Sequence, residues 1–289
     1  VLNIYKEGGT NMYNLASTDY VGISFWLVSA AMLAATAFFF LERSTVNGKW
    51  KTSLTVAGLV TGIAFWHYLY MRGMWIETGT SPTVYRYVDW LLTVPLQVVE
   101  FYLILAAVTT VRGGVFFKLL ISSLVMLIAG YLGEAGLAPV LPAFVIGCAA
   151  WLYIIYEIFA GETSKINAAS GNVASQTAFS AMKWILTVGW VIYPVGYYLG
   201  YLGSGVDANS LNLVYNLADF VNKILFGLII WDVARKDSSK DLKEDVNAKD
   251  LLEKAGKYLS RNEKLKRFGK GAVAGGVAEG VFVGDIEDV

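Results

Sequence analysis

Seven apolar stretches, each long enough to cross about 30 Å of hydrocarbon as an α-helix, constrain the fold of this chain more than any other feature. Short polar or glycine-rich links separate them, and Lys118 lies near the start of the fourth. We predict an all-α integral membrane protein, a bundle of seven transmembrane helices. The stretches are residues 19–42, 51–75, 83–108, 114–132, 138–160, 175–201 and 209–234.

Charged residues divide the chain into a membrane body and an aqueous tail. Only 16% of the residues are charged, whereas soluble domains carry about a quarter. Residues 1–234 hold 11 of the 23 Lys and Arg residues and 12 of the 23 Asp and Glu residues, so the last 55 residues hold 12 and 11. We therefore expect a short outer segment at 1–18, a membrane domain at 19–234 and a charged cytoplasmic tail at 235–289.

Basic residues choose the orientation, because loops that carry Lys and Arg stay in the cytoplasm. They flank the first, third and fifth links and follow the seventh stretch, while the fourth and sixth links have none. The N-terminus is therefore predicted outside and the C-terminus inside. The basic residues at the first, third and fifth links are Arg43, Lys49, Lys51, Arg112, Lys118 and Lys165.

The content of cysteine and histidine leaves little room for metal chemistry. Cys148 is the single cysteine and His67 the single histidine, so an intramolecular disulfide is excluded and a metal site lacks ligands. Cys148 is interpreted as a small packing residue. Leu2–Tyr20 has no basic segment followed by an apolar stretch, which predicts no intact signal peptide. No nucleic-acid partner is expected, and no motif indicates an enzyme.

Ionisable residues inside the apolar stretches are costly and therefore indicate function. Glu157 and Lys183 lie nearer the cytoplasmic ends of their stretches, where reaching out to the interface is the simpler interpretation. Glu134, in the fourth link, is interpreted as a solvated loop acid. The ionisable residues well inside the stretches are His67, Arg86, Asp89, Glu100, Asp219 and Lys223.

Lys223 lies well inside the seventh stretch, with apolar residues on both sides. Asp219 precedes it by one helical turn on the same face. One interpretation is an ion pair that only holds helices together. The other is a desolvated amine that condenses with an aldehyde, with Asp219 balancing the resulting positive charge.

The third stretch carries Asp89, Thr93 and Glu100 at spacings of four and seven residues. At about 100° per residue they fall within about 40° of one another, and the two carboxyls are about 16 Å apart along the axis. Arg86 lies on nearly the same face. Two unrelated buried acids in an ordinary transporter would fit, but acids on either side of a central cation form a proton path across the bilayer.

Four motifs identify a family. They are RYVDWLLTVPLQVVEFYLIL (Arg86–Leu105), GIAFWHYLYMRGMW (Gly62–Trp75), GWVIYPVGY (Gly189–Tyr197) and LADFVNKILFG (Leu217–Gly227). Together and in this order they resemble microbial rhodopsins, specifically proteorhodopsins of the blue-absorbing type. The resemblance covers roughly residues 15–235. It implies a light-driven outward proton pump, and a multi-pass protein of the inner, plasma membrane of a bacterium.

The resemblance also implies a role for each buried ionisable residue. Lys223 would carry all-trans retinal as a protonated Schiff base. Asp89 would be the counter-ion and proton acceptor, Asp219 the second counter-ion and Arg86 the balancing cation. Glu100 would be the cytoplasmic proton donor, and apolar surroundings favour the protonated carboxyl that a donor needs.

Two further positions match the family. Thr93 is the middle residue of the Asp–Thr–Glu signature, and His67 matches the histidine that hydrogen-bonds the acceptor. Trp26 matches the residue that this histidine contacts in the neighbouring protomer of ring-shaped oligomers. The resemblance therefore implies a homo-oligomeric ring with contacts between Trp26 and His67 of adjacent protomers.

A long polyene needs an apolar slot, and aromatic residues beside the motifs can supply it. Trp90, Trp190 and Tyr193 are predicted to clamp the chromophore. Pro95 and Pro194 are expected to kink the third and sixth helices; Pro194 also lines the pocket. The list of predicted retinal-binding residues is therefore Lys223, Trp90, Gln97, Trp190, Tyr193 and Pro194.

Gln97 is predicted to set the colour. It lies eight residues after Asp89, about 80° around the helix, and in proteorhodopsins glutamine at this position goes with blue absorption and leucine with green. A dipole near the charged nitrogen stabilises the ground state more than the excited state. Asp207 is the only acid of the sixth link, so the paired-acid release device of haloarchaeal pumps is absent.

Rival functions are a sensory photoreceptor of the same fold, a sodium or chloride pump, and a transporter without chromophore. Glu100 argues against the sensor, which often lacks a carboxyl there. Asp89 and Glu100 stand where a sodium pump has Asn and Gln, and a chloride pump lacks the carboxylate at Asp89. The tail is interpreted as cytoplasmic and partly helical.

Overall fold

The computed structural model describes residues 15–203 and 205–274, and all regular structure in this part is helical. Seven helical segments are long and apolar enough to cross a membrane, so the predicted seven-helix fold is confirmed. The predicted limits differ from the observed ones by a few residues, except that the seventh helix does not end at residue 234 but continues to Ala274. The membrane segments are α1 (Tyr20–Glu42), α2 (Lys51–Thr78), α3 (Thr83–Ala106), α4 (Gly113–Glu134), α5 (Val140–Phe159), a composite sixth segment, and α9, which begins at Ala208.

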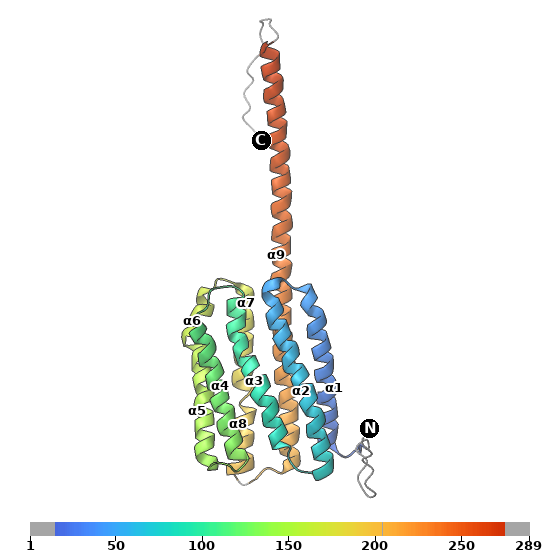
Figure 1. Cartoon of the computed structure of the whole chain (residues 1–289), viewed down its shortest axis with the longest axis vertical. Coiled ribbons are helices and arrows are strands. Elements are labelled where there is room, and N and C mark those ends of the chain that lie inside the picture. The colour runs from blue at the N-terminus through green and yellow to red at the C-terminus, as the bar shows by residue number, and fades with distance from the viewer. Residues whose placement is uncertain (1–14, 204, 275–289) are drawn as a thin grey trace. The chain divides into compact units, whose positions relative to one another are not determined.

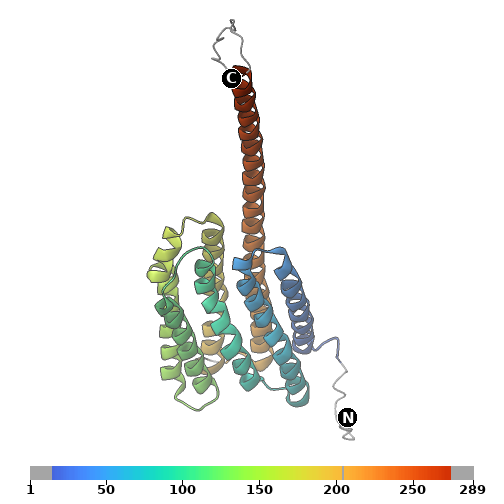
Figure 2. The same cartoon turned by 45° about the horizontal axis from the view of Figure 1, so that its top comes forward.

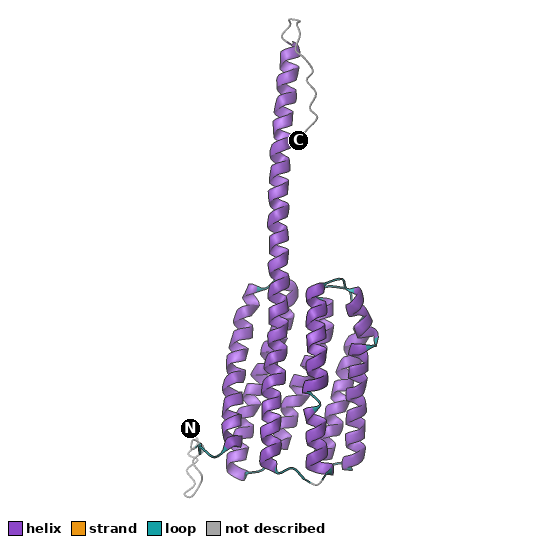
Figure 3. Cartoon of the chain, turned by 180° about the vertical axis from the view of Figure 1, so that it is seen from behind, coloured by secondary structure: helices purple, strands orange, loops and turns teal. Residues whose placement is uncertain are grey.

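The sixth segment is built from several pieces. It comprises α7 (Val173–Trp184), a π-helix η3 (Ile185–Gly189), α8 (Ile192–Tyr197) and a second π-helix η4 (Tyr198–Leu202). Pro194 has no N–H to donate to the carbonyl of Trp190, and the N–H of Tyr193 takes that carbonyl at 3.1 Å instead. The break shows as a short loop within the segment (Figure 3).

The two predicted proline kinks have different outcomes. α3 runs unbroken from Thr83 to Ala106 although Pro95 lies inside it, whereas the helix containing Pro194 is interrupted just before the proline. A proline in a membrane helix is tolerated when neighbouring groups or local adjustments of the helix provide hydrogen bonds for the backbone groups that the proline leaves unpaired. The expected disruption is therefore found in the sixth segment, while α3 remains continuous as an α-helix.

Local chemistry fixes several helix ends. The side chain of Asp19 accepts a hydrogen bond from Gly22 N at 2.8 Å and caps α1, and Asn172 caps α7 in the same way through Ser175 N. Gly79 ends α2 with a φ of 64°, a left-handed conformation that glycine adopts without strain. Short links containing η1 (Arg43–Thr45), η2 (Gly48–Trp50) and α6 (Glu162–Ala169) connect the membrane segments.

The membrane segments stand side by side, with α4, α5 and the sixth segment on one side of α3 and with α1, α2 and α9 on the other (Figures 1 and 2). Polar contacts join α9 to both sides. Asn216 donates to Ser24 on α1 at 2.9 Å, and Asn222 donates to the Gly189 carbonyl of the sixth segment at 3.0 Å. These bonds hold α9 against the helices that surround the buried polar residues.

Polarity is arranged as a lipid environment requires. The outward faces carry large apolar side chains such as Leu41 and Trp66, which are exposed, while the interior contains polar and charged groups. Buried groups of this kind need partners or a function because no water solvates them. The buried charged residues of the bundle are Arg72, Arg86, Asp89, Glu100, Glu157, Asp219, Lys223 and Asp237.

The prediction that Glu157 reaches out to the membrane interface is wrong. Its side chain is buried, with an exposed fraction of 3%. Its carboxylate lies 3.5 Å from Lys118 Nζ and accepts a bond from the backbone N–H of Glu162 at 3.1 Å. The carboxylate therefore ties α4, α5 and α6 together. Lys183 is half-buried, with its ammonium 4.5 Å from the ring centre of Phe159.

The two ends of the chain extend past the described residues. Of the predicted outer segment 1–18, residues 1–14 lie outside them, as do residues 275–289 of the predicted tail. From Ser239 a second unit begins, in which α9 continues to Ala274. Ion pairs one turn apart, such as Asp250 with Lys254 at 2.7 Å, line this part of the helix and support helix formation.

Gly227 lies where α9 packs tightly against Phe39 of α1, and it yields a stability prediction. A Cβ at this position would lie 2.4 Å from the ring of Phe39, which is fully buried. We expect Gly227→Ala to lower the free energy of unfolding by about 1–3 kcal/mol through overpacking. The thermal midpoint of the detergent-solubilised protein measures the effect.

Gly256→Ala is the matched control, because the same change in the same helix meets no atom within 4 Å and improves helix propensity. Equal stability of the two variants would contradict close packing of α9 against Phe39.

Candidate functional site

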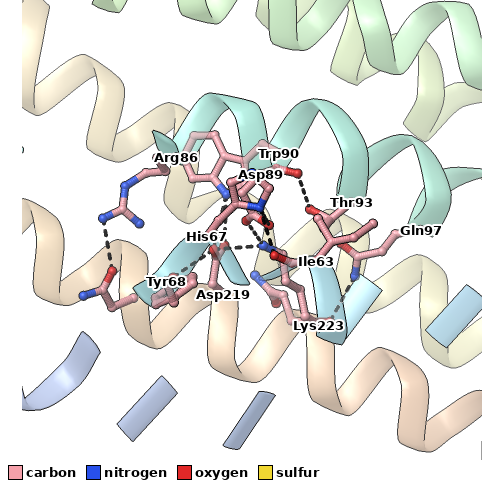
Figure 4. A network of polar contacts seen from close by, with 12 residues as sticks. Ile63, His67, Tyr68, Arg86, Asp89, Trp90, Thr93, Gln97, Asp219 and Lys223 are labelled. Atoms are coloured by element: carbon pink, nitrogen blue, oxygen red, sulfur yellow. Dashed lines mark hydrogen bonds and ion pairs between the residues drawn. The ribbon is translucent and has the colours of Figure 1, made fainter. Parts of the chain in front are cut away.

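The centre of the bundle is a buried ammonium held between two carboxylates. Lys223 Nζ donates to Asp89 on α3 and to Asp219 on α9, the latter at 3.0 Å (Figure 4). All three side chains are at most 2% exposed. Burial makes an unpaired charge very costly, so each member of this cluster depends on the others.

Asp219 has its oxygens occupied by several donors besides Lys223. Tyr68 donates to Oδ2 at 2.9 Å and Trp90 Nε1 to Oδ1 at 3.2 Å (Figure 4). Tyr193 also donates to Oδ1, at 2.7 Å. Sequence reasoning missed Tyr68, because an isolated tyrosine in an apolar helix looks like a packing residue. Its position one residue after His67 was the only available signal.

The carboxylate of Asp89 accepts fewer hydrogen bonds than that of Asp219. Its Oδ1 has no hydrogen-bond partner among the described residues, and His67 Nδ1 lies 3.9 Å from it. The same imidazole nitrogen is 2.9 Å from the carbonyl of Ile63. Thr93 donates its hydroxyl to the backbone carbonyl of Asp89 at 3.0 Å. His67 and Thr93 therefore both lie beside Asp89 (Figure 4). Spacing along the helix predicts this for Thr93 and the resemblance implies it for His67, although 3.9 Å is too long for the expected hydrogen bond.

Arg86 is fully buried but contacts neutral partners. It donates to Asn212 at 2.9 Å and to Asn216 at 3.1 Å. Its Nε and its other terminal nitrogen have no hydrogen-bond partner among the described residues. No ion pair of Arg86 with Asp89 or Asp219 is present in that part of the chain. The two asparagines on α9 were not predicted, since their role depends on which helix faces Arg86.

Lys223 and Asp219 line an apolar pocket inside the bundle. The predicted residues Trp90, Gln97, Trp190, Tyr193 and Pro194 all line it, and so do Met126, Trp151 and Cys148. Cys148, which was interpreted as a packing residue, therefore also lines this pocket.

Glu100 lies apart from this cluster. It is 1% exposed on α3, and its carboxyl oxygens have no well-formed hydrogen bond among the described residues, with Ser53 the polar side chain that interacts with it. It does not line the pocket. Asp89 and Glu100 are thus two buried acids at different depths on one helix, about 16 Å apart along its axis.

The interpretation of Glu134 as a solvated loop acid is wrong. It is the last residue of α4, is half-buried, and accepts a hydrogen bond from the Tyr87 hydroxyl at 2.9 Å. It also lines the same pocket as Lys223. The error arose because α4 extends two residues beyond the predicted end of its stretch, which turns Glu134 inward.

Comparisons with known proteins agree with this geometry. The model of the bacteriorhodopsin-like protein family matches residues 19–237. A blue-light absorbing proteorhodopsin from Gamma-proteobacterium Hot 75m4 is 68% identical over 228 residues, covering 78% of this chain and 90% of that protein. This chain is a member of the bacteriorhodopsin-like family, as a proteorhodopsin. A green-light absorbing proteorhodopsin from Gamma-proteobacterium EBAC31A08 is 66% identical over 240 residues, covering 82% of this chain and 94% of that protein.

The fold of this proteorhodopsin also matches solved structures. The crystal structure of a blue light-absorbing proteorhodopsin from Med12 superposes with a TM-score of 0.67 at 62% identity, covering 76% of this chain and all of that chain. The predicted similarity to the blue-absorbing type is therefore confirmed. The chain is a multi-pass protein of the bacterial plasma membrane, and its family implies a retinal chromophore.

The residues present fit retinal. The buried amine of Lys223 lines the pocket, where an aldehyde could reach it, and Trp90 and Trp190 offer flat apolar surfaces in the same lining. Trp26 lies elsewhere, 40% exposed on α1, with the guanidinium of Arg72 stacked 3.8 Å from its ring centre. No contact between Trp26 and His67 occurs within the described chain.

The ion cluster yields a test that needs no retinal. Lys223→Met leaves two buried carboxyls without their cation, and we expect a loss of about 3 kcal/mol of unfolding free energy. Adding Asp219→Asn removes one of the carboxyls that require the cation, so the double variant should be more stable than the sum of the single losses. Unfolding of the retinal-free protein in detergent measures all three variants.

Lys236→Met is the control, because Lys236 also pairs with an aspartate one turn earlier, Asp232 at 2.6 Å, but in exposed positions. Screening by water should make its effect small. Strict additivity of the Lys223 and Asp219 changes would show that the cluster contributes no coupling.

Proposed function

We propose that this proteorhodopsin is a light-driven outward proton pump that carries all-trans retinal on Lys223. One observation supports it above all: the amine is buried between two carboxylates in the lining of an apolar pocket, and a further buried acid, Glu100, lies further along α3 than Asp89. Movement of a proton from one side to the other needs a central carrier and an acid on each side.

Bound retinal would supply a nitrogen at Lys223 whose proton becomes transferable on illumination. The protein then decides where this proton goes. The oxygens of Asp219 accept bonds from two tyrosines and a tryptophan, whereas Asp89 Oδ1 has no such donor. We therefore assign the acceptor role to Asp89, with Asp219 as the carboxylate that keeps its charge.

Glu100 is assigned as the donor that restores the proton. It lies in the other half of α3 from Asp89, nearer the end of the bundle that carries the basic links with Lys49 and Lys118. Basic links lie in the cytoplasm, so Glu100 supplies protons from the inside and Asp89 passes them outwards. His67 beside Asp89 and Arg86 nearer the outer end complete the charged path.

We also propose that protomers assemble into a ring. His67 is only 14% exposed while Trp26 is 40% exposed, so Trp26 is available to an adjacent protomer. A contact between Trp26 of one protomer and His67 of the next would connect the acceptor Asp89 to its neighbour.

A sensory photoreceptor of the same fold is the second candidate. The buried Glu100 disfavours it, because a sensor does not need rapid return of a proton from the cytoplasm. A transporter that uses the Lys223–Asp219 pair without a chromophore is also disfavoured, because the aromatic residues that line the pocket would have no role in it.

Light-induced acidification tests the proposal. Cells that express the chain with retinal in unbuffered medium should acidify the medium on illumination, and an uncoupler should erase the signal. Asp89→Asn should reduce the initial rate by about 100-fold or more while leaving a coloured protein, because the acceptor is lost.

Asp207→Asn is the matched control, since it makes the same chemical change in an exposed link and an asparagine can still cap α9. Full pumping by the Asp89 variant would contradict the assignment of the acceptor, and a signal that persists with the uncoupler would contradict proton pumping.

Colour gives an independent prediction. Gln97 lines the pocket, and its side-chain amide donates to the Asn222 carbonyl at 3.3 Å, one residue before Lys223. We expect a wild-type maximum in the blue and a shift to longer wavelength in Gln97→Leu, because the amide dipole favours the charged ground state. The absorption spectrum of the purified pigment measures both, and an unchanged maximum in the variant would refute the role of Gln97.

A further inference from the structure

Asp237 and its partners form a polar cluster at the end of the bundle that carries the basic links, and the pump described above does not use it. The carboxylate is buried on α9, with an exposed fraction of 5%. Its Oδ2 lies 2.7 Å from Lys49 Nζ and accepts a hydrogen bond from Trp50 Nε1 at 2.9 Å. Its Oδ1 accepts a bond from Asn172 Nδ2 at 3.2 Å. One carboxylate therefore joins α9 to the first link and to the start of the sixth segment.

The three contacts of Asp237 differ in strength. The contact with Lys49 is short and joins opposite charges, and Trp50 is fully buried. Asn172 is a neutral donor at the longest of the three distances, and it is half-buried. When Asn172 moves away, the carboxylate keeps its other two partners, so no unpaired charge is left in the interior. The cluster therefore opens most readily at Asn172, while the first link stays attached to α9.

The bond from Asn172 also fixes the position of α7. The same side chain caps α7 through Ser175 N at 2.8 Å, so one amide connects the start of this helix to α9. Further along α7, the ring of Phe179 packs against Phe101 on α3, with 5.0 Å between the ring centres. Phe101 follows Glu100 directly, and both rings are fully buried. α7 thus covers the part of α3 that carries Glu100.

The break in the sixth segment makes it possible for α7 to move as a unit. The π-helix η3 and the turn before Pro194 interrupt the regular backbone between α7 and α8, and helices bend at such interruptions. The carbonyl of Gly189 in η3 accepts a bond from Asn222 at 3.0 Å. Because Asn222 precedes Lys223, a movement at Lys223 is transmitted to the break and from there to α7.

We propose that Asp237 is a positioning residue of the pump and acts through Asn172. Their hydrogen bond holds α7 over Glu100, and release of this bond sets the rate at which Glu100 takes up a proton from the cytoplasm. The inference rests on the proposed pump, in which Glu100 gives its own proton to the nitrogen of Lys223 before the uptake. One proton then enters at Glu100 for each proton that Asp89 passes outwards.

Flash photolysis of the pigment in oriented vesicles, with a pH-indicator dye on the cytoplasmic side, tests the proposal. Asn172→Ser keeps a side-chain oxygen that caps α7 but removes the donor to Asp237. We expect proton uptake to become about fivefold faster, the change in population that loss of one net hydrogen bond gives. The earlier proton transfer from Lys223 to Asp89 should keep its rate, and the absorption maximum should not move.

Asn172→Asp and Asn209→Ser bracket this result. Asn172→Asp also caps α7 but places a second carboxylate beside Asp237, so it should speed uptake more than Asn172→Ser does. Asn209→Ser is the matched control, because it makes the same chemical change at an exposed position at the other end of the bundle. It should keep the uptake rate of the wild type.

A double variant tests whether Asp237 acts through Asn172. Asp237→Ala removes the acceptor and should also speed uptake. Combining it with Asn172→Ser should add no further acceleration, because both changes break the same bond. The two Asn172 variants keep the proposal testable if Asp237→Ala does not fold.

Hydrogen–deuterium exchange of the pigment, in the dark and under continuous illumination, tests where the cluster opens. Illumination should speed amide exchange in α7 over residues 177–184 and leave the first link, residues 43–50, at its dark rate. In Asn172→Asp, exchange in α7 should already be faster in the dark.

The outcomes separate this inference from the pump itself. A pigment that acidifies the medium but takes up protons at the wild-type rate in Asn172→Ser and Asn172→Asp would overturn the inference and leave the pump intact. Additive acceleration in the double variant would overturn action through Asn172. Equal acceleration of exchange in α7 and in the first link would overturn opening at Asn172. Absence of light-driven acidification in the wild type would overturn the pump, and the inference with it.

Discussion

The ammonium of Lys223 between Asp89 and Asp219 is the interaction on which the rest of the structure depends. A charge at this depth is unfavourable unless opposite charges and hydrogen-bond donors surround it. Three helices supply them: α2 gives Tyr68, α3 gives Asp89 and Trp90, and the sixth segment gives Tyr193, all directed at α9. The requirement to satisfy one buried cation thus fixes how the helices face one another.

The same requirement makes the site switchable. A pump needs a centre whose proton affinity changes and acids that differ in their surroundings. Asp219 is held by four donors, Asp89 by fewer, and Glu100 lies in an apolar region without a well-formed bond. In the proposed pump, three carboxyls of the same chemistry would therefore acquire different roles from their environments.

Much of the fold and site followed from residue spacing. Stretch length predicted seven helices, and a helical repeat predicted that Asp219 and Lys223 share a face and that Asp89, Thr93 and Glu100 form one stripe. Distances between helices could not be predicted, because nothing in a single chain's periodicity states which faces meet. Tyr68, Asn212 and Asn216 were missed for this reason. Glu157 was misjudged because its partners lie on other helices, and Glu134 because α4 extends two residues beyond its predicted end.

The sequence by itself determined the number of membrane helices, the buried lysine and its neighbour Asp219, since these depend on composition and on spacing along one helix. The resemblance of four motifs indicated the family and the place of Asp89 beside the lysine. Only the tertiary structure decided which donors satisfy Asp219, that Arg86 bonds neutral amides, and that Glu134 lines the retinal pocket. Those contacts join residues of different helices, and their geometry arises from packing one helix against another.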